Sequence, residues 1–100
     1  MKVIVKAPNN PAIEVEIENE LEALQGIVGG YIECVYLPNG AILICNEEGK
    51  IRNLPRNFIT QRDVIKGTVI ICGESEEDFD DVSITLDEFN QMLIDWGNDL

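Results

Sequence analysis

The sequence predicts an α+β domain in which two helices cover a mainly antiparallel sheet of about six strands, in the order ββαββββα. Residues 12–18 alternate apolar and polar side chains, the pattern of a half-buried strand. Asn39-Gly40 stands between two apolar runs and is a strong hairpin signal. Residues 85–96 begin with a capping box and carry one apolar face at helical spacing. A chain of 100 residues, 45% of them hydrophobic, predicts a single domain over residues 1–100.

The first two strands are expected at residues 2–7 and 12–18, joined by a turn rich in proline and asparagine. Ile13, Val15 and Ile17 would share the buried face of the second strand, with glutamates on the other face. The two strands should therefore form an antiparallel hairpin.

A short helix is expected next, at residues 20–28. Asn19 would cap its start, with Glu22 at the capping-box position. Gly29-Gly30 would end it, because glycine adopts the left-handed conformation without steric penalty.

Residues 31–37 and 41–46 are expected to pair around a type I′ turn at Asn39-Gly40, which places Cys34 opposite Cys45. We expect these two residues to be reduced thiols in contact, since the chain carries no signal-peptide pattern that would imply an oxidising compartment. Both faces of this hairpin are largely apolar, which predicts a central position in the sheet.

The remaining strands are weaker predictions. Lys50–Leu54 would be a fifth, more polar strand near an edge, and residues 55–66 an irregular stretch or a short helical turn. Residues 67–72 are apolar enough for an interior strand, and residues 73–81 would be an acidic surface loop.

The last helix has the clearest signals in the chain. Thr85 and Glu88 have the spacing of a capping box, and Gly97 would stop the helix. The apolar face consists of Leu86, Phe89, Met92, Leu93 and Trp96. This face should pack on the sheet.

Charge is segregated along the chain, whose net charge is −12. Residues 50–66, which we call the basic segment, carry five bases and one acid, between two strongly acidic stretches. Arginine donors suit phosphate or carboxylate, and Phe58 or Tyr31 could stack on a base. The predicted ligand-binding residues are Lys50, Arg52, Arg56, Asn57, Phe58, Arg62 and Lys66. Two alternatives stay open: these bases pair with the protein's own carboxylates, or the segment docks on an acidic patch of a second subunit.

Residues 74–81, which we call the acidic segment, could serve only solubility or could dock on a basic protein partner, with nucleic-acid mimicry as a special case. The predicted docking residues are Glu74, Glu76, Glu77, Asp78, Asp80 and Asp81. Calcium binding is disfavoured because the EF-hand spacing fails.

Composition also argues against several classes of function. The chain has no histidine and no glycine-rich phosphate loop, so we predict no enzyme activity and no cofactor. Three scattered cysteines without a CxxC pair argue against a structural metal. The net charge of −12 disfavours direct binding to nucleic acid or anionic lipid. No apolar run reaches signal-peptide or membrane-helix length, so a soluble cytoplasmic protein is expected.

Five blocks of sequence resemble an uncharacterised family of small proteins from phages, plasmids and gut-type Gram-positive bacteria, domain of unknown function three-eight-four-six. They are MKVIVK at residues 1–6, ELEALQGIVGGYIE at 20–33, CNEEG at 45–49, NLPRN at 53–57 and IKGTVII at 65–71. The resemblance extends from Met1 to about Gly73. In the family pattern an arginine follows the Leu-Pro-x-Asn element, where this chain has Phe58, so Arg56 and Arg62 are the candidates to replace it.

The resemblance implies a genomic setting and no reaction. Together with the charge pattern it favours a non-catalytic binding protein of a phage or mobile element. This protein would act in counter-defence by sequestering a small anionic, nucleotide-type ligand at residues 50–66. One alternative is an acidic inhibitor that docks on a basic host protein such as a nuclease. Another is a structural phage protein whose partner is itself, a homo-oligomer.

Overall fold

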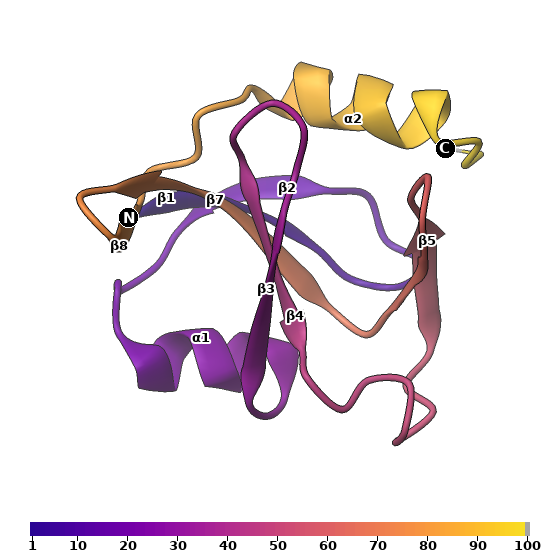
Figure 1. The fold of residues 1–100 in the computed structure, drawn as a ribbon, viewed down its shortest axis with the longest axis horizontal. Helices are drawn as coiled ribbons and strands as arrows, with labels where there is room; N and C mark the ends of the chain where they lie inside the picture. The colour runs from indigo at the N-terminus through magenta and orange to yellow at the C-terminus, as the bar shows by residue number, and fades with distance from the viewer. Residues whose placement is uncertain (100) are drawn as a thin grey trace.

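Two helices lie on opposite faces of a six-stranded antiparallel sheet in the computed structural model, which describes residues 1–99 (Figure 1). The sheet has the order β2-β1-β7-β4-β3, with β8 paired to the end of β7, and β5 and β6 form a separate hairpin. The α+β class is confirmed. The elements are β1 (Lys2–Lys6), β2 (Ile13–Glu16), α1 (Leu21–Val28), β3 (Ile32–Tyr36), β4 (Ile42–Asn46), β5 (Arg56–Ile59), β6 (Val64–Lys66), β7 (Val69–Ser75), β8 (Asp78–Asp80) and α2 (Leu86–Asp95).

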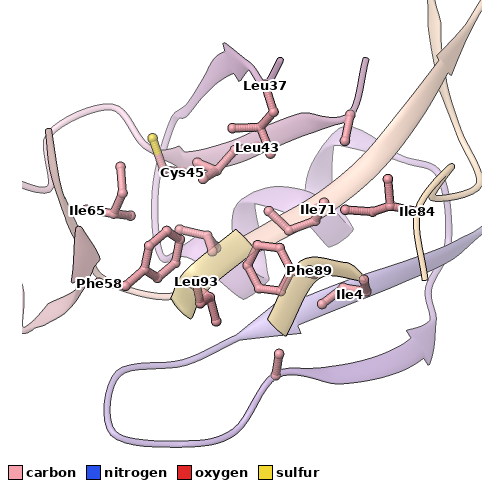
Figure 2. Close-up of a cluster of buried hydrophobic side chains, with 13 residues drawn as sticks. Ile4, Leu37, Leu43, Cys45, Phe58, Ile65, Ile71, Ile84, Phe89 and Leu93 are labelled. Atoms are coloured by element: carbon pink, nitrogen blue, oxygen red, sulfur yellow. The ribbon is translucent and has the colours of Figure 1, made fainter. Parts of the chain in front are cut away.

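The central strands β4 and β7 are apolar on both faces because each face is covered by a helix. Ile42, Ile44 and Ile70 point toward α1 and pack with its buried residues Leu24 and Val28. The alternate residues of the two strands point toward α2 and join a second core around Phe89 and Leu93 (Figure 2). Each fully buried aliphatic or aromatic side chain contributes about 1.5–3 kcal/mol, so these two cores hold the three layers together.

The first helix lies where the sequence predicts it, but its predicted cap is wrong. Glu20 occupies the N-cap position and makes no side-chain cap hydrogen bond. The Asn19 side chain instead donates from Nδ2 to the carbonyl oxygen of Phe79 in β8, at 2.9 Å. At the other end Gly29 has φ 81°, and its N–H donates to the Gln25 carbonyl, as predicted for a glycine stop.

The register of the β3–β4 hairpin differs by one residue from the prediction. Cys34 lies opposite Ile44, so Cys34 and Cys45 are on opposite faces of the sheet. The reason is a three-residue loop, in which the Leu37 N–H donates to the Ala41 carbonyl and only Gly40 has a positive φ. The three cysteines are free thiols, as predicted. Of the two strands of this hairpin, β4 lies in the interior of the sheet as predicted, but β3 forms an edge.

Residues 50–66 are built differently from the prediction. Residues 50–53 form turns in place of the predicted strand, and a hydrogen bond from the Leu54 N–H to the Gly49 carbonyl closes them. The stretch predicted to be irregular contains the β5–β6 hairpin, whose buried residues are Phe58 and Ile65. Burial of these two apolar side chains under α2 outweighs the polar composition around them.

The acidic segment is also more ordered than the predicted loop. It forms a tight hairpin between β7 and β8, in which Ser75 pairs with Asp78. The two turn residues, Glu76 and Glu77, have φ of 48° and 68°, a conformation that glutamate seldom adopts. Sequence gives no sign of this turn because glycine or asparagine normally fills such positions.

The second helix confirms its prediction in detail. The Glu88 N–H donates to Thr85 Oγ1 and the Thr85 N–H donates to Glu88 Oε1, both at 3.0 Å. These two bonds form the predicted capping box. Phe89 and Leu93 are buried, and Gly97 follows the helix with φ 96°.

Candidate anion-binding site

A cavity of about 710 Å³ opens where the end of β1, the β1–β2 turn, β5 and the C-terminal end of α2 meet. Two cationic residues, Lys6 and Arg56, line this cavity, and we call it the Lys6–Arg56 groove. Its other polar lining consists of Asn9, Asn10, Asn57, Asn90, Asn98 and Asp99. Its volume lies within the usual range for small-molecule sites, about 300–1,000 Å³.

Lys6 occupies a position where a strand normally places an apolar side chain. It follows Ile4 by two residues and therefore points to the same face of the sheet, toward the core under α2. The residue is only 8% exposed. Its Nζ donates to the Ala7 carbonyl at 3.1 Å. Burial lowers the pKa of Lys6 below its usual value, because desolvation disfavours the charged ammonium.

No carboxylate of residues 1–99 pairs with Lys6. The ion pairs in this part of the chain join the N-terminus to Glu16, Lys2 to Glu14 and Lys50 to Asp63. Buried cations are normally paired, since an unpaired charge in a poorly solvated place is costly. Lys6 is therefore a cation with unused capacity to bind an anion.

Arg56 supplies the second positive charge. It is the first residue of β5, is exposed, and forms no ion pair with the described carboxylates. Its guanidinium carries planar, forked donors that suit a phosphate or carboxylate. Asp99, also exposed, is the one carboxylate that lines the groove within residues 1–99, so the balance there is +1 in a protein of net charge −12.

Two asparagines fix the walls of the groove. Asn98 donates from Nδ2 to the carbonyls of Ile59 and Leu93, and its Oδ1 accepts from the Ile59 N–H. Asn57 donates from Nδ2 to the carbonyls of Lys6 and Gly67, both at 2.8 Å, and so ties β5 to β1 beside the cation.

Asn57 also leaves one polar atom without a partner. Its Oδ1 is buried and accepts no hydrogen bond from residues 1–99. Such an atom normally has a partner, because burying it unpaired costs about 1–3 kcal/mol. The wall beside the two cations thus contains an acceptor that is shielded from solvent and that no donor of residues 1–99 reaches.

Most of the predicted basic segment does not gather at one place. Lys50 pairs with Asp63, and Lys66 donates to Asn53 Oδ1 at 3.2 Å. Arg52 donates from Nη1 to the Gly29 carbonyl at the C-terminal end of α1, at 3.1 Å. Lys50 and Lys66 line a second depression and Arg62 lines a third. Of the predicted ligand-binding residues, Arg56, Asn57 and the largely buried Phe58 line the Lys6–Arg56 groove.

The predicted stacking residues need correction. Phe58 is 2% exposed and packs edge-on against Phe89, with ring centroids 6.0 Å apart, and parallel to Trp96 at 6.1 Å. Its ring is part of the core under α2 (Figure 2) and has no free face for a base. Tyr31 is exposed but lies before β3 and does not line the groove.

Sequence reasoning missed Lys6. The available signal was its spacing: Lys6 shares the parity of Ile4 in a short apolar strand, so the alternation itself placed a cation on the buried face. The asparagines of the following turn, Asn9 and Asn10, were interpreted only as turn formers, although both also line the groove.

Several residues of the acidic segment make hydrogen bonds within the fold. Asp81 Oδ1 accepts from the Lys2 N–H at 2.8 Å, and Glu74 Oε2 accepts from the Tyr36 hydroxyl at 3.0 Å. The carboxylates of Asp78 and Asp80 accept from the next N–H along the chain. Glu76 and Glu77 form the tip of the β7–β8 hairpin.

The family model described as "Domain of unknown function (DUF3846)" matches residues 1–94. No curated protein and no solved structure matched the chain. Neither helix of residues 1–99 is long and apolar enough to cross a membrane. The same residues contain no group of three or more cysteine, aspartate or glutamate side chains arranged to hold a metal ion.

Proposed function

The chain belongs to the DUF3846 family, and we propose that it is a non-catalytic binding protein that holds a small anionic ligand of nucleotide size in the Lys6–Arg56 groove. The observation that carries the proposal is the buried Lys6, which has no carboxylate partner in residues 1–99. An anion placed there would pair with an ammonium that no carboxylate of residues 1–99 reaches.

The chemistry of the groove suits capture. The Lys6 ammonium and the Arg56 guanidinium provide charge-assisted hydrogen bonds, each about 1.5–3 kcal/mol. Asn9 and Asn90 also line the groove, and their amides can form hydrogen bonds with hydroxyl or amino groups of an organic anion. In the phage or mobile-element setting that the family resemblance implies, the protein would sequester a host nucleotide signal in the cytoplasm and so act in counter-defence.

The test is a thermal-shift and calorimetry panel of linear and cyclic nucleotides, with inorganic phosphate as the minimal anion. A binder should raise the Tm of the wild type, and Arg56→Gln should reduce its affinity at least tenfold. Arg62→Gln is the matched control, because it removes the same charge from a surface outside the groove. A panel without any shift at millimolar concentration, or equal losses in both variants, would contradict the proposal.

A second candidate function is docking of the acidic segment on a basic host protein. The tight turn favours it, because Glu76 and Glu77 stand next to each other, both exposed, at the tip of the β7–β8 hairpin. The expected sign is a salt-sensitive association that the pair Glu76→Gln and Glu77→Gln weakens. Glu14→Gln with Glu16→Gln removes the same charge from β2. If both pairs weaken the association equally, net charge and not this hairpin is responsible.

A further inference from the structure

β3 is an edge strand whose one neighbouring strand within residues 1–99 is β4, and it runs in front of the other strands in Figure 1. The Leu37 N–H donates to the Ala41 carbonyl, and the Glu47 N–H donates to the Tyr31 carbonyl. In an antiparallel pair such bonds recur at every second residue. The backbone groups of Ile32, Cys34 and Tyr36 therefore point away from β4.

These outward groups have no partner in another element of residues 1–99. They form a row of donors and acceptors ready to pair with a further strand. The opposite edge of the sheet, β2, is protected by glutamates at positions 14 and 16 and by the nearby Pro11. β3 has no lysine or proline, and its five pairs with β4 run in unbroken register without a bulge.

The same edge carries exposed apolar side chains. Tyr31 and Tyr36 are each 67% exposed and Val35 is 38% exposed, and these are three of the seven large exposed hydrophobic residues of the described chain. An apolar edge strand without such protection is uncommon in a protein that remains alone in solution. The other four exposed hydrophobic residues lie outside β3, and one of them, Ile51, lines the same depression as Val35.

We propose that β3 pairs antiparallel with β3 of a second copy of this chain, about a twofold axis at Cys34, to form a dimer with one continuous sheet. In that register Ile32 faces Tyr36 of the second copy, and Glu33 faces Val35 of the second copy. Apolar side chains meet on one face, and no carboxylate lies opposite another.

The alternative registers fit less well. An axis at Glu33 would place the two Glu33 carboxylates directly opposite each other, which is unfavourable. An axis at Val35 would shorten the pairing, because it places Ile32 against Pro38 beyond the end of the strand. Charge and strand length together therefore select the Cys34-centred register, the only one of the three that uses the whole of Ile32–Tyr36. This interface is independent of the proposed ligand site.

The net charge of −12 on each copy opposes association, and this predicts its salt dependence. Salt screens the repulsion between copies but leaves hydrogen bonds and apolar contacts largely unchanged. The dimer should therefore tighten as sodium chloride rises, which is the reverse of the behaviour expected for docking on a basic partner.

The test is sedimentation equilibrium of the full chain at low and high salt, with two variants at one position. Cys34→Pro removes an outward N–H while the bonds to β4 stay, so the monomer should fold and the dimer should weaken at least tenfold. Cys34→Ser is the matched control and should dimerise like the wild type. Circular dichroism and Tm establish that both variants fold.

A second readout does not depend on the proline variant. Opposed Cys34 residues would have Cα atoms about 5.5 Å apart, so a short bismaleimide should link two wild-type copies, but not two copies of Cys34→Ser. Wild-type protein that stays monomeric at all salt and protein concentrations would overturn the proposal. So would a dimer that Cys34→Pro leaves unchanged, or one in which Cys34 does not cross-link.

Discussion

At the scale of single residues, Lys6 combines a cost in stability with a capacity to bind. Its ammonium is nearly buried and has no carboxylate partner among residues 1–99. Methionine has a similar length and no charge, so Lys6→Met should remove the desolvation cost and stabilise the ligand-free protein by about 1 kcal/mol. The same change should abolish anion binding. Thermal melts with and without ligand measure both effects, and a destabilised variant would show that the ammonium is already well satisfied.

The lowered pKa of Lys6 gives this comparison a pH dependence. Between its folded pKa and the ordinary value of 10.5, the unfolded chain binds more protons than the folded one, so stability rises with pH. The advantage of Lys6→Met over the wild type should therefore shrink in that window and persist below it. A difference in Tm that stays constant from neutral pH to about 10.5 would contradict the assignment.

The three cysteines should differ sharply in reactivity. Burial raises the pKa of Cys45 to about 11 and of Cys72 to about 12, and both side chains are buried. Cys34 is exposed, although burial of its thiol and the nearby Glu33 carboxylate also raise its pKa. Iodoacetamide at pH 8 should therefore alkylate Cys34 first, as read by peptide mass spectrometry. Equal labelling of all three in the native protein would contradict the packing of β4 and β7.

At the scale of elements, the β7–β8 turn stores strain that a better turn sequence should release. Glu76 and Glu77 are held at positive φ, where a non-glycine residue costs about 1 kcal/mol or more. Asn-Gly suits both positions of such a turn. The double substitution Glu76→Asn with Glu77→Gly should therefore raise the free energy of unfolding by about 1–2 kcal/mol in a denaturant titration. Glu48→Gly, at a residue without a positive φ, is the control and should not stabilise.

The sequence predicted an element correctly where its signal depends on contacts between residues close together in the chain. The Thr85–Glu88 capping box and the glycine after α1 were read correctly, because each depends on atoms a few residues apart. The prediction that Asn19 caps α1 was wrong because its amide donates to the carbonyl of Phe79, sixty residues away. The β5–β6 hairpin was missed because its core residue, Phe58, is defined by packing on Phe89 and Trp96, which sequence spacing does not reveal.

At the scale of the whole molecule, charge segregation predicted one binding site in the basic segment, but the fold places the bases of this segment at different parts of the surface. Three-dimensional neighbours decide the fate of each cation: Lys50 pairs with Asp63, Arg52 binds the end of α1, and Arg56 alone joins Lys6. The candidate site joins β1 to β5, two segments that sequence reasoning treated separately. A charge plot along the chain therefore indicates that an anion site is plausible, but the fold determines which bases form it.

The excess of acidic residues also determines how the fold responds to salt. Nineteen acids face seven bases, and two side-chain ion pairs form within residues 1–99, so most carboxylates repel one another without compensation. Sodium chloride should therefore raise Tm between 20 and 500 mM, by screening that repulsion more than it weakens the pairs. Tm should be measured on the Cys34→Pro variant, because the proposed dimer is weakened there and its own salt dependence does not contribute to Tm. A Tm that falls with salt would mean that exposed pairs such as Lys50–Asp63 stabilise the fold more than the unpaired carboxylates destabilise it.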